Sequence, residues 1–328
     1  MNIAIIGLEG LVAKTFLKVL EQENFSAVFY FISTEPRKEK FFSFKKKKVP
    51  IFTIPQFDFS ATNLVVFLAG TDIAKHYAPL AKKAGNLVID ISSAFRDDPK
   101  VPLIIPAVNG QSLAKNRVPS IIASPNCTTT QLLSAIYPIE KKSGLKQLNI
   151  TTYQSVSGSG IAGIETLTNE VMAWSKKSSV KKTSYDYPIA FNVFPHIDDL
   201  LDNGYTQEEM RLINEAKKIL NNKKLSISAT CVRVPVLFGH SLAVTLETKR
   251  TITLAALKKL LQKTPGVIYC DDIPVPTPLE SFDQSCIFVG RLHKDLHLKN
   301  TFHLWIVADN VKRGIVMNVI EILKLLDK

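Results

Sequence analysis

Cysteine is scarce in this chain of 328 residues, which contains only four. Their spacing fits neither a disulfide scaffold nor the paired ligands of a structural zinc site. No apolar run approaches the roughly 18 residues that a membrane-spanning helix needs. A strand-like run begins at once, so we expect no signal peptide. These absences predict a cytoplasmic protein with no metal and no membrane contact.

The composition is that of an ordinary globular protein, with 46% apolar and 21% charged residues. The length allows two domains. The net charge is +12, from 41 basic and 29 acidic residues. The lysines are scattered, however, with the densest run at 45–48, and no recognisable nucleic-acid-binding module accompanies them. Solvated surface explains the charge better than nucleic acid does, and attraction of anionic substrates is a second possibility.

The first third of the chain alternates strand-like and helical patterns. Apolar runs predict buried strands at 3–6, 27–32, 64–68, 87–91 and 103–105, and helical spacing falls at 11–22 and 73–84. This alternation predicts an α/β fold with a doubly wound parallel sheet. Later strand-like segments, at 148–154, 225–236 and 241–248, alternate polar and apolar residues and predict a mixed or antiparallel sheet. A terminal helix follows, with Asp309 or Asn310 as its N-cap.

Cys127 lies between a short apolar run, 120–123, and a helical pattern that begins near Leu132. A thiol at a helix N-terminus is favoured as thiolate, and the N–H groups there can stabilise an oxyanion. This is the setting that a nucleophilic cysteine requires. The alternative is a small buried apolar residue.

A glycine-containing turn follows the first strand and opens the first helix. Gly7 and Gly10 suit close approach of a pyrophosphate to a helix N-terminus. Glu9 is awkward there, because a carboxylate beside phosphates repels them unless it points away. The alternative is a plain strand-to-helix turn. At the end of the second strand, Arg37 and Lys38 outweigh Glu35 and favour the 2′-phosphate of NADP.

Isolated polar residues occur in the later strands. Gln154 ends one strand, Arg233 interrupts an apolar run, and His240 lies between two strands. A buried arginine needs an anionic partner, and a histidine suits proton exchange near neutrality. Each residue also has a structural alternative, an internal ion pair for Arg233 and a satisfied loop residue for His240.

Taken together, these segments resemble the aspartate-semialdehyde dehydrogenase family over almost the whole chain. The resemblance is carried by ISSAFR at 91–96, PNCT at 125–128, YQSVSG at 153–158, IAFNVFPH at 189–196, NGYTQEEM at 203–210, RVPV at 233–236 with GHS at 239–241, and LWIVADN at 304–310. Each motif is weak alone, but their order and spacing are specific.

The resemblance implies a role for each polar residue. Cys127 would attack the acyl carbon and form a thioester, His240 would be the general acid/base, and Gln154 would orient the acyl group. Arg233 would hold the substrate α-carboxylate in a bidentate grip. The other implied substrate contacts are Glu208 for the amino group, Arg96 and Arg211 for phosphate, and Asn126 for positioning phosphate beside the thiol.

The family also implies the architecture and the reaction. Residues 1–126 with 308–328 would form a Rossmann-type NADP-binding domain, and residues 127–307 an α+β catalytic and dimerisation domain with a mixed sheet. Expected cofactor contacts are Gly7, Gly10, Leu11, Val12, Arg37, Lys38, Gly70, Ser157, Gly158 and Asn310. The protein would be a homodimer or a dimer of dimers. It would reduce aspartyl phosphate with NADPH to aspartate semialdehyde, toward lysine and diaminopimelate, threonine and methionine.

Some positions depart from the family pattern. Leu8, Glu9 and Leu11 replace small residues of the turn, and the usual Ser-x-Gly-Lys segment is absent after the second strand. An acetylglutamyl-phosphate reductase shares the fold and the thiol mechanism, but usually has Gly-Cys where this chain has Asn-Cys. A non-catalytic paralogue remains the other alternative. Retention of the polar set argues against it.

Overall fold

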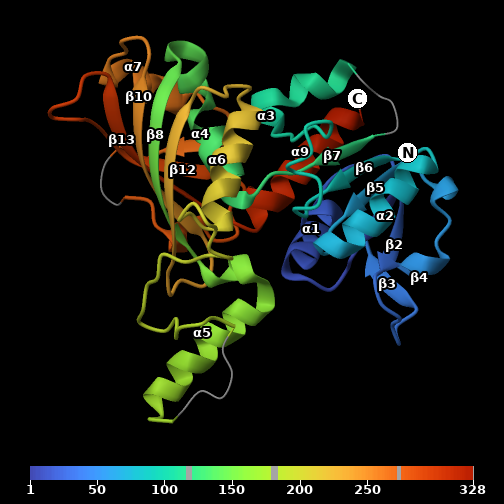
Figure 1. Cartoon of the computed structure of the whole chain (residues 1–328). Helices are drawn as coiled ribbons and strands as arrows, with labels where there is room; N and C mark the ends of the chain where they lie inside the picture. The colour runs from blue at the N-terminus through green and yellow to red at the C-terminus, as the bar shows by residue number, and fades with distance from the viewer. Residues whose placement is uncertain (116–119, 179–183, 272–274, 328) are drawn as a thin grey trace. The chain divides into compact units, whose positions relative to one another are not determined.

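The computed structural model describes residues 1–115, 120–178, 184–271 and 275–327, and the chain divides into two compact units (Figure 1). The first unit contains Met1–Asn126 and Ile315–Lys328, and the second contains Cys127–Gly314. The family resemblance implies a return to the first unit at residue 308. The structure places it at Ile315, because Asp309 and Asn310 still accept hydrogen bonds from the backbone N–H groups of Asp283 and Gly239.

The first unit contains a seven-stranded sheet in the order β3-β4-β2-β1-β5-β6-β7, parallel except for the edge strand β3. Its strands are β1 (Asn2–Ile6), β2 (Val28–Ser33), β3 (Phe41–Phe44), β4 (Lys47–Thr53), β5 (Leu64–Phe67), β6 (Leu87–Asp90) and β7 (Ile121–Ala123). Its helices are α1 (Leu11–Gln22), α2 (Thr71–Lys83), α3 (Pro106–Asn109) and α9 (Met317–Leu326), with 3₁₀ helices η1 (Ile54–Gln56), η2 (Phe59–Ala61) and η3 (Gly110–Lys115). The predicted doubly wound fold is confirmed.

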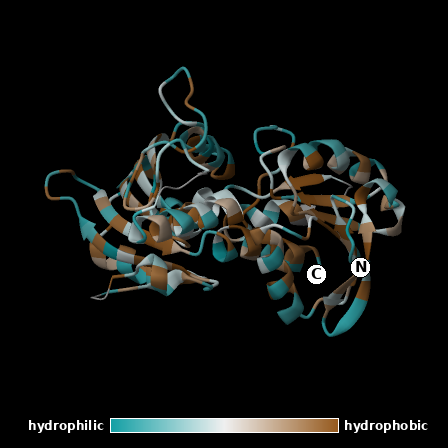
Figure 2. Cartoon of the chain, turned by 90° about the horizontal axis from the view of Figure 1, so that it is seen from below, coloured by the Kyte–Doolittle hydropathy of each residue, from teal (hydrophilic) through white to brown (hydrophobic). Residues whose placement is uncertain are grey.

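The core of this unit follows from the apolar runs. Strands β1 and β5 are buried along nearly their whole length, as expected of parallel strands covered on both faces. Hydrophobic residues accordingly concentrate on the sheet strands in Figure 2. Phe16 of α1 and Ile320 of α9 both pack into this core.

Two details of the sheet differ from the prediction. The hairpin of β3 and β4 was not predicted, because its turn uses Lys45 and Lys46 in the left-handed region, where a sequence normally signals a turn with Asn or Gly. The expected strand at 103–105 is only an isolated bridge from Leu103 to Ala123. Pro106 opens α3 directly after it, so the run is too short for a ladder.

The second unit contains a six-stranded mixed sheet in the order β11-β12-β13-β10-β8-β9. Its strands are β8 (Leu145–Gln154), β9 (Ser226–Arg233), β10 (His240–Thr248), β11 (Val267–Tyr269), β12 (Ile287–Lys294) and β13 (Thr301–Ala308). Its helices are α4 (Cys127–Ser143), α5 (Gly160–Ser175), α6 (Gln207–Ile219), α7 (Leu254–Gln262) and α8 (Pro278–Ser281), with η4 (Val156–Ser159) and the π-helical turn η5 (Lys312–Val316), which crosses the unit boundary. The predicted mixed sheet is confirmed.

Helices α4, α6 and α7 pack against strands of this sheet, while α5 extends away from it (Figure 1). Asp309, one of the two expected N-caps, accepts hydrogen bonds from the N–H groups of Val311 and Lys312 through Oδ1. It therefore caps the π-helical turn, and α9 begins only at Met317. Among the described residues, no helix is long and apolar enough to cross a membrane.

A buried asparagine joins α2 to the segment before β5. Asn86 Nδ2 donates to the carbonyl oxygens of Phe59 and Ala81 at 2.8 and 3.1 Å, and its Oδ1 accepts from Thr62 Oγ1 at 2.8 Å. We expect Asn86→Ala to lower the free energy of unfolding by about 2–4 kcal/mol, because buried polar groups lose their partners. Urea denaturation measures this. Asn24→Ala, at an exposed loop position, is the control and should change stability by less than about 0.5 kcal/mol. Equal free energies of unfolding for the two variants would contradict a stabilising role for the Asn86 hydrogen bonds.

Candidate active site

Three predicted residues lie at the same end of adjacent strands in the second unit. Gln154 is the last residue of β8, Arg233 is the last of β9, and His240 is the first of β10. Gln154 pairs with Arg233 in the parallel register, and Tyr153 pairs with Ser241 in the antiparallel one. Sheet register therefore brings together side chains that lie far apart in the sequence.

His240 is fully buried and held from one side of its ring. The Ser155 N–H donates to Nδ1 at 3.0 Å, and Ser155 Oγ lies 3.1 Å from the same nitrogen. Burial first, and then the nearby Arg233 cation, lower the pKa of His240 well below its ordinary value. Because an N–H group can only donate, Nδ1 is the acceptor, and the neutral ring carries its proton on Nε2. Nε2 is buried and has no hydrogen-bond partner among the described residues.

Arg233 is buried beside this histidine and fixed by two groups. Its Nη1 donates to the Ser155 carbonyl oxygen at 2.7 Å, and its guanidinium carbon lies 5.8 Å from the centre of the Tyr185 ring. Nε has no hydrogen-bond partner among the described residues. A buried guanidinium with an unused N–H is suited to an anionic ligand. Sequence reasoning missed both Ser155 and Tyr185, since neither the backbone contact nor the ring contact has a local sequence signal.

The space in front of both side chains is kept open by a glycine. A Cβ atom built on Gly158 would lie 3.1 Å from Arg233 Nη1 and 3.4 Å from His240 Nε2. A larger residue here would therefore crowd both groups. Ser157 and Asn310, expected as cofactor contacts, lie behind the histidine: Asn310 Oδ1 accepts hydrogen bonds from the hydroxyls of Ser155 and Ser157.

Gln154 belongs to a buried polar network with α6. Its Nε2 donates to Glu208 Oε1 at 3.1 Å, and its Oε1 accepts from Thr152 Oγ1 at 2.9 Å. Arg211 forms ion pairs with Glu208, at 3.6 Å, and with Asp198. The structure therefore brings together Gln154, Glu208 and Arg211, three of the residues expected around a substrate.

Cys127 is the first residue of α4, as predicted, and is only half-buried. Gly314 packs directly on it, because an added Cβ there would lie 2.7 Å from Cys127 Cβ. One turn along α4, Gln131 Nε2 donates to the carbonyl oxygen of Ala308, which pairs with His240 between β13 and β10. The start of α4 is thus fixed to the strand beside the histidine.

The other three cysteines lie in surroundings that disfavour the thiolate. Burial, and then the neighbouring Glu208 carboxylate, raise the pKa of the Cys231 thiol. Burial also raises the pKa of the thiols of Cys270 and Cys286. These cysteines are disfavoured as nucleophiles, since the thiolate is the reactive form.

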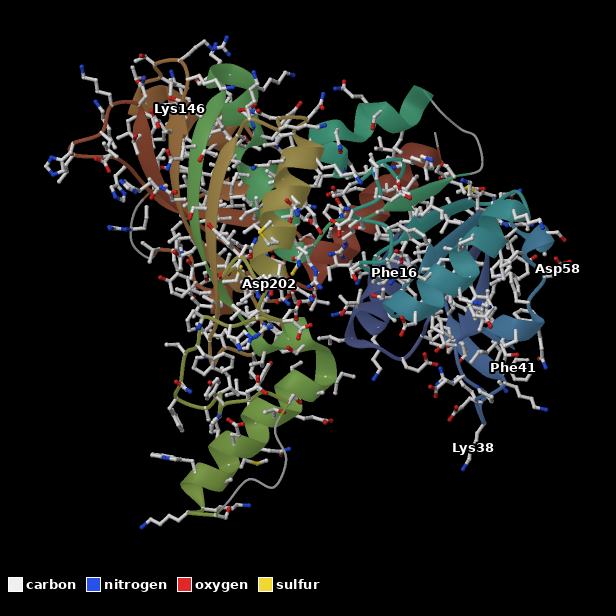
Figure 3. The ribbon with its side chains drawn as sticks, in the orientation of Figure 1. Phe16, Lys38, Phe41, Asp58, Lys146 and Asp202 are labelled. Atoms are coloured by element: carbon white, nitrogen blue, oxygen red, sulfur yellow. The ribbon has the colours of Figure 1, made fainter. Side chains whose placement is uncertain are left out.

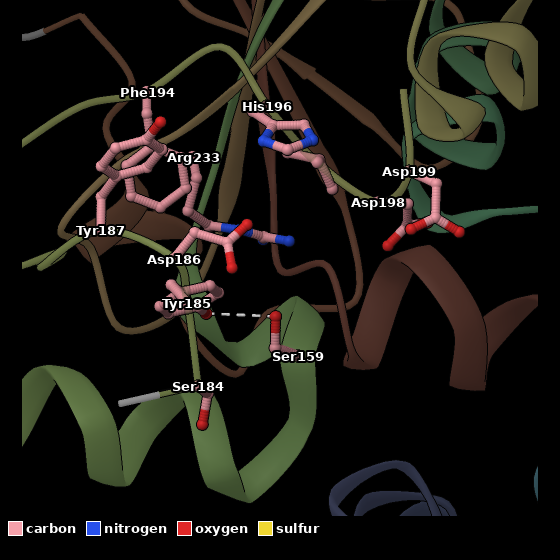
Figure 4. A pocket seen from close by; sticks show the side chains of 11 residues that line it. Ser159, Ser184, Tyr185, Asp186, Tyr187, Phe194, His196, Asp198, Asp199 and Arg233 are labelled. Carbon is pink, nitrogen blue, oxygen red and sulfur yellow. Dashed lines mark hydrogen bonds between the residues drawn. The ribbon is translucent and has the colours of Figure 1, made fainter. Parts of the chain in front are cut away.

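Arg233 also faces a pocket of about 270 Å³ (Figure 4). On its aromatic side, Tyr185 Oη donates to Ser159 Oγ at 3.1 Å. The remaining lining residues are Ser184, Asp186, Tyr187, Phe194, His196, Ile197, Asp198 and Asp199. The pocket thus offers a buried cation and several carboxylates, a combination suited to a small zwitterionic ligand.

The predicted cofactor residues of the first unit surround the turn between β1 and α1. Gly7 has φ +88°, and a Cβ added to Gly10 or Gly70 would meet no atom within 4 Å. The turn therefore has the backbone and the open space that a dinucleotide needs. Leu11 and Val12, also expected as contacts, begin α1.

Two further predicted cofactor residues of the first unit, Arg37 and Lys38, follow β2. Lys38 extends into solvent (Figure 3), and Arg37 forms an ion pair with Glu9 at 3.2 Å. Arg96 also belongs to this unit, where its Nη2 donates to the Ile91 carbonyl oxygen at 2.6 Å, and Asn126 is the unit's last residue before Cys127. No group of three or more His, Cys, Asp or Glu side chains in the described segments could hold a metal ion.

Known proteins match both units. Residues 2–116 match the family described as "Semialdehyde dehydrogenase, NAD binding domain", and residues 136–313 match "Semialdehyde dehydrogenase, dimerisation domain". An aspartate-semialdehyde dehydrogenase from Aquifex aeolicus is 39% identical over 100% of this chain and 98% of the relative.

Solved structures agree with these matches. The crystal structure of aspartate semialdehyde dehydrogenase II from Vibrio cholerae is 37% identical, covers 99% of this chain and 98% of that one, and has a TM-score of 0.95. The same enzyme complexed with ASA matches with the same score and identity, over 99% of this chain and 97% of that one. Fold and full-length similarity agree: the chain belongs to the aspartate-semialdehyde dehydrogenase family.

Proposed function

We propose that this chain catalyses the NADPH-dependent reductive dephosphorylation of L-aspartyl 4-phosphate, giving L-aspartate 4-semialdehyde and phosphate. The observation that carries the proposal is the convergence of Gln154, Arg233 and His240 at one end of the second sheet. The aspartate semialdehyde dehydrogenase names of full-length relatives support the same substrate.

Cys127 is the proposed nucleophile. Its sulfur attacks the acyl carbon of aspartyl phosphate, the carbon–oxygen bond to phosphate breaks, and a thioester remains on Cys127. The first unit would hold the dinucleotide, which when bound would supply the hydride that reduces this thioester. Expulsion of the Cys127 thiolate from the resulting thiohemiacetal then releases the semialdehyde. The N-terminal N–H groups of α4 favour the thiolate and stabilise negative charge on the acyl oxygen.

His240 is the proposed general acid/base. Its hydrogen bonds define the protonation state of its ring in the resting enzyme. With Nδ1 accepting from Ser155, the resting neutral ring presents its Nε2–H as a hydrogen-bond donor to a thiolate or an oxyanion and keeps the proton. Taking up a second proton would put N–H groups at both Ser155 N and Nδ1, which face each other. The resting enzyme therefore holds a neutral histidine.

The substrate amino acid is held by the buried charges. Arg233 binds the α-carboxylate through its remaining N–H groups, and Glu208 binds the ammonium. Gln154, hydrogen-bonded to Glu208, orients the acyl group. Arg96, Arg211 and Asn126 hold phosphate.

The dinucleotide is bound by the turn after β1, with Gly7, Gly10, Leu11 and Val12, and by Gly70. Arg37 and Lys38 favour NADP. Ser157, Gly158 and Asn310 complete the proposed contacts from the second unit.

The dimerisation-domain match supports a homodimer or a dimer of dimers. A reducing cytoplasm keeps the Cys127 sulfur reduced and out of disulfides. The product leads toward lysine and diaminopimelate, threonine and methionine.

Removing the sulfur tests covalent catalysis. Cys127→Ala should lower phosphate-dependent reduction of NADP by aspartate semialdehyde at least roughly a thousandfold, with folding unchanged by circular dichroism. Cys286→Ala, at another half-buried cysteine, should retain turnover. Acetylglutamate semialdehyde is the comparison substrate. A Cys127→Ala rate near that of the wild type would exclude the thioester, and a preference for the acetylated substrate would exclude the proposed reaction.

Replacing the guanidinium fork tests carboxylate binding. Arg233→Lys keeps the charge but loses the planar pair of donors. We expect KM for aspartate semialdehyde to rise about tenfold or more, with a smaller change in kcat, as measured by steady-state kinetics. An unchanged KM would show that Arg233 does not bind the carboxylate.

The lowered pKa of His240 predicts a pH dependence of stability. Between the ordinary histidine pKa of about 6.5 and the lower value in the fold, only the unfolded chain binds the proton. The free energy of unfolding should therefore fall as the pH falls through this window, by up to about 1.4 kcal/mol per pH unit. In urea denaturation at pH 7 and 5.5, His240→Gln should flatten this slope, while His76→Gln, at an exposed histidine, should retain it. Identical slopes in wild type and His240→Gln would rule out a neutral buried ring.

A further inference from the structure

Glu9 lies in the turn between β1 and α1, where a carboxylate repels the phosphates of a cofactor unless it points away. In the structure the carboxylate is folded back toward the end of β2. Oε2 accepts from the Leu8 N–H at 2.9 Å, and Oε1 accepts from Ser33 Oγ at 3.0 Å and from Arg37 Nη1 at 3.2 Å. The carboxylate therefore reaches the segment that distinguishes the two nicotinamide dinucleotides.

This arrangement engages the residue proposed to read the 2′-phosphate. Arg37 pairs with Glu9 through Nη1 and with Glu39 through Nε, at 3.2 and 3.5 Å. The two carboxylates differ in their surroundings. The Glu9 side chain is 49% exposed but accepts from the Leu8 N–H of the turn and from Ser33 at the end of β2, whereas the Glu39 side chain is 67% exposed. Of the two carboxylates, Glu9 is therefore the one held beside Arg37 by further hydrogen bonds.

The two cofactors present different groups to such a charge. A ribose 2′-hydroxyl can donate a hydrogen bond to a carboxylate, whereas a 2′-phosphate is itself an anion and needs a cation. A fixed carboxylate beside the phosphate site repels that anion and competes with it for the guanidinium. Glu9 thus acts against the preference that Arg37 and Lys38 confer.

We propose that Glu9 is a specificity-determining residue for the cofactor, one that reduces discrimination in favour of NADP over NAD by opposing the 2′-phosphate and occupying Arg37. This inference rests on the proposed dinucleotide-binding role of the first unit. It makes the chain more permissive for NAD than Arg37 and Lys38 alone would. A purely structural role for Glu9, holding the turn through Leu8 and Ser33, would instead affect both cofactors alike.

Binding measurements on the full chain separate these roles. Isothermal titration with NADP, NAD and adenosine 2′,5′-bisphosphate is compared for wild type, Glu9→Gln and Glu39→Gln. Each variant removes one negative charge from a partner of Arg37. Of the two carboxylates, Glu9 is the one that accepts a hydrogen bond from the turn, at the Leu8 N–H. Glu9→Ser replaces Glu9→Gln if the amide variant does not fold. Arg37→Gln tests reading of the 2′-phosphate separately.

For Glu9→Gln we expect the ratio of NADP to NAD affinity to rise at least about fivefold. The bisphosphate should bind more tightly to the same extent, and Glu39→Gln should change the ratio less than about twofold. An unchanged ratio, an equal change for both cofactors, or the same gain in Glu39→Gln would overturn the inference while leaving the cofactor assignment intact. If wild type binds neither dinucleotide, the proposed function fails and the inference with it. If Arg37→Gln leaves NADP binding unchanged, the proposed reading of the 2′-phosphate by Arg37 fails independently of Glu9.

Discussion

The backbone of Ser155 connects the imidazole and the guanidinium of the candidate active site. Its N–H donates to His240 Nδ1, and its carbonyl oxygen accepts from Arg233 Nη1. The protonation state of the imidazole and the orientation of the guanidinium are therefore fixed by the same residue. Since a backbone contact survives most side-chain substitutions, this constraint depends on where β8 ends rather than on which side chain residue 155 carries.

That arrangement also explains why a cation and a histidine can share a buried site. A protonated imidazole beside Arg233 would place like charges in a poorly solvated environment, and burial alone already disfavours it. Keeping the ring neutral removes the repulsion and leaves Arg233 as the positive group that an anionic ligand would meet. Glu208, on the other side of Gln154, supplies the opposite charge. The site is thus divided into a positive and a negative region, as an α-amino acid requires.

Much of this could be predicted from the sequence where a pattern is local. The alternation of apolar runs predicted the parallel sheet, and the helix over Leu11–Gln22 has the predicted bounds. Cys127 at the start of α4 followed from one strand-like run and one helical pattern. The β3–β4 hairpin was missed because its turn residues, Lys45 and Lys46, are lysines rather than the Asn or Gly that normally signals a turn. Tyr185 and Ser155 were missed because their roles arise from contacts across the fold. The direction in which the Glu9 side chain points was likewise beyond the sequence, since either orientation fits the same turn.

In the proposed reaction, substrate choice depends on the negative region around Glu208 rather than on the thiol. A thiol, a histidine and a helix N-terminus suit any acyl phosphate, including one whose amine is acetylated. An acetylated amine carries no charge and would leave the Glu208 carboxylate without a cationic ligand. Arg211 lies 3.6 Å from Glu208 and also pairs with Asp198, so Glu208 keeps a positive neighbour when no ligand is present. A substrate ammonium would add a second cation to a carboxylate already held in place by Gln154, whereas a neutral amide would offer no charge. On the proposed assignment of Glu208 to the substrate ammonium, the same thiol chemistry is therefore directed to a free amino acid by a carboxylate that takes no part in bond making.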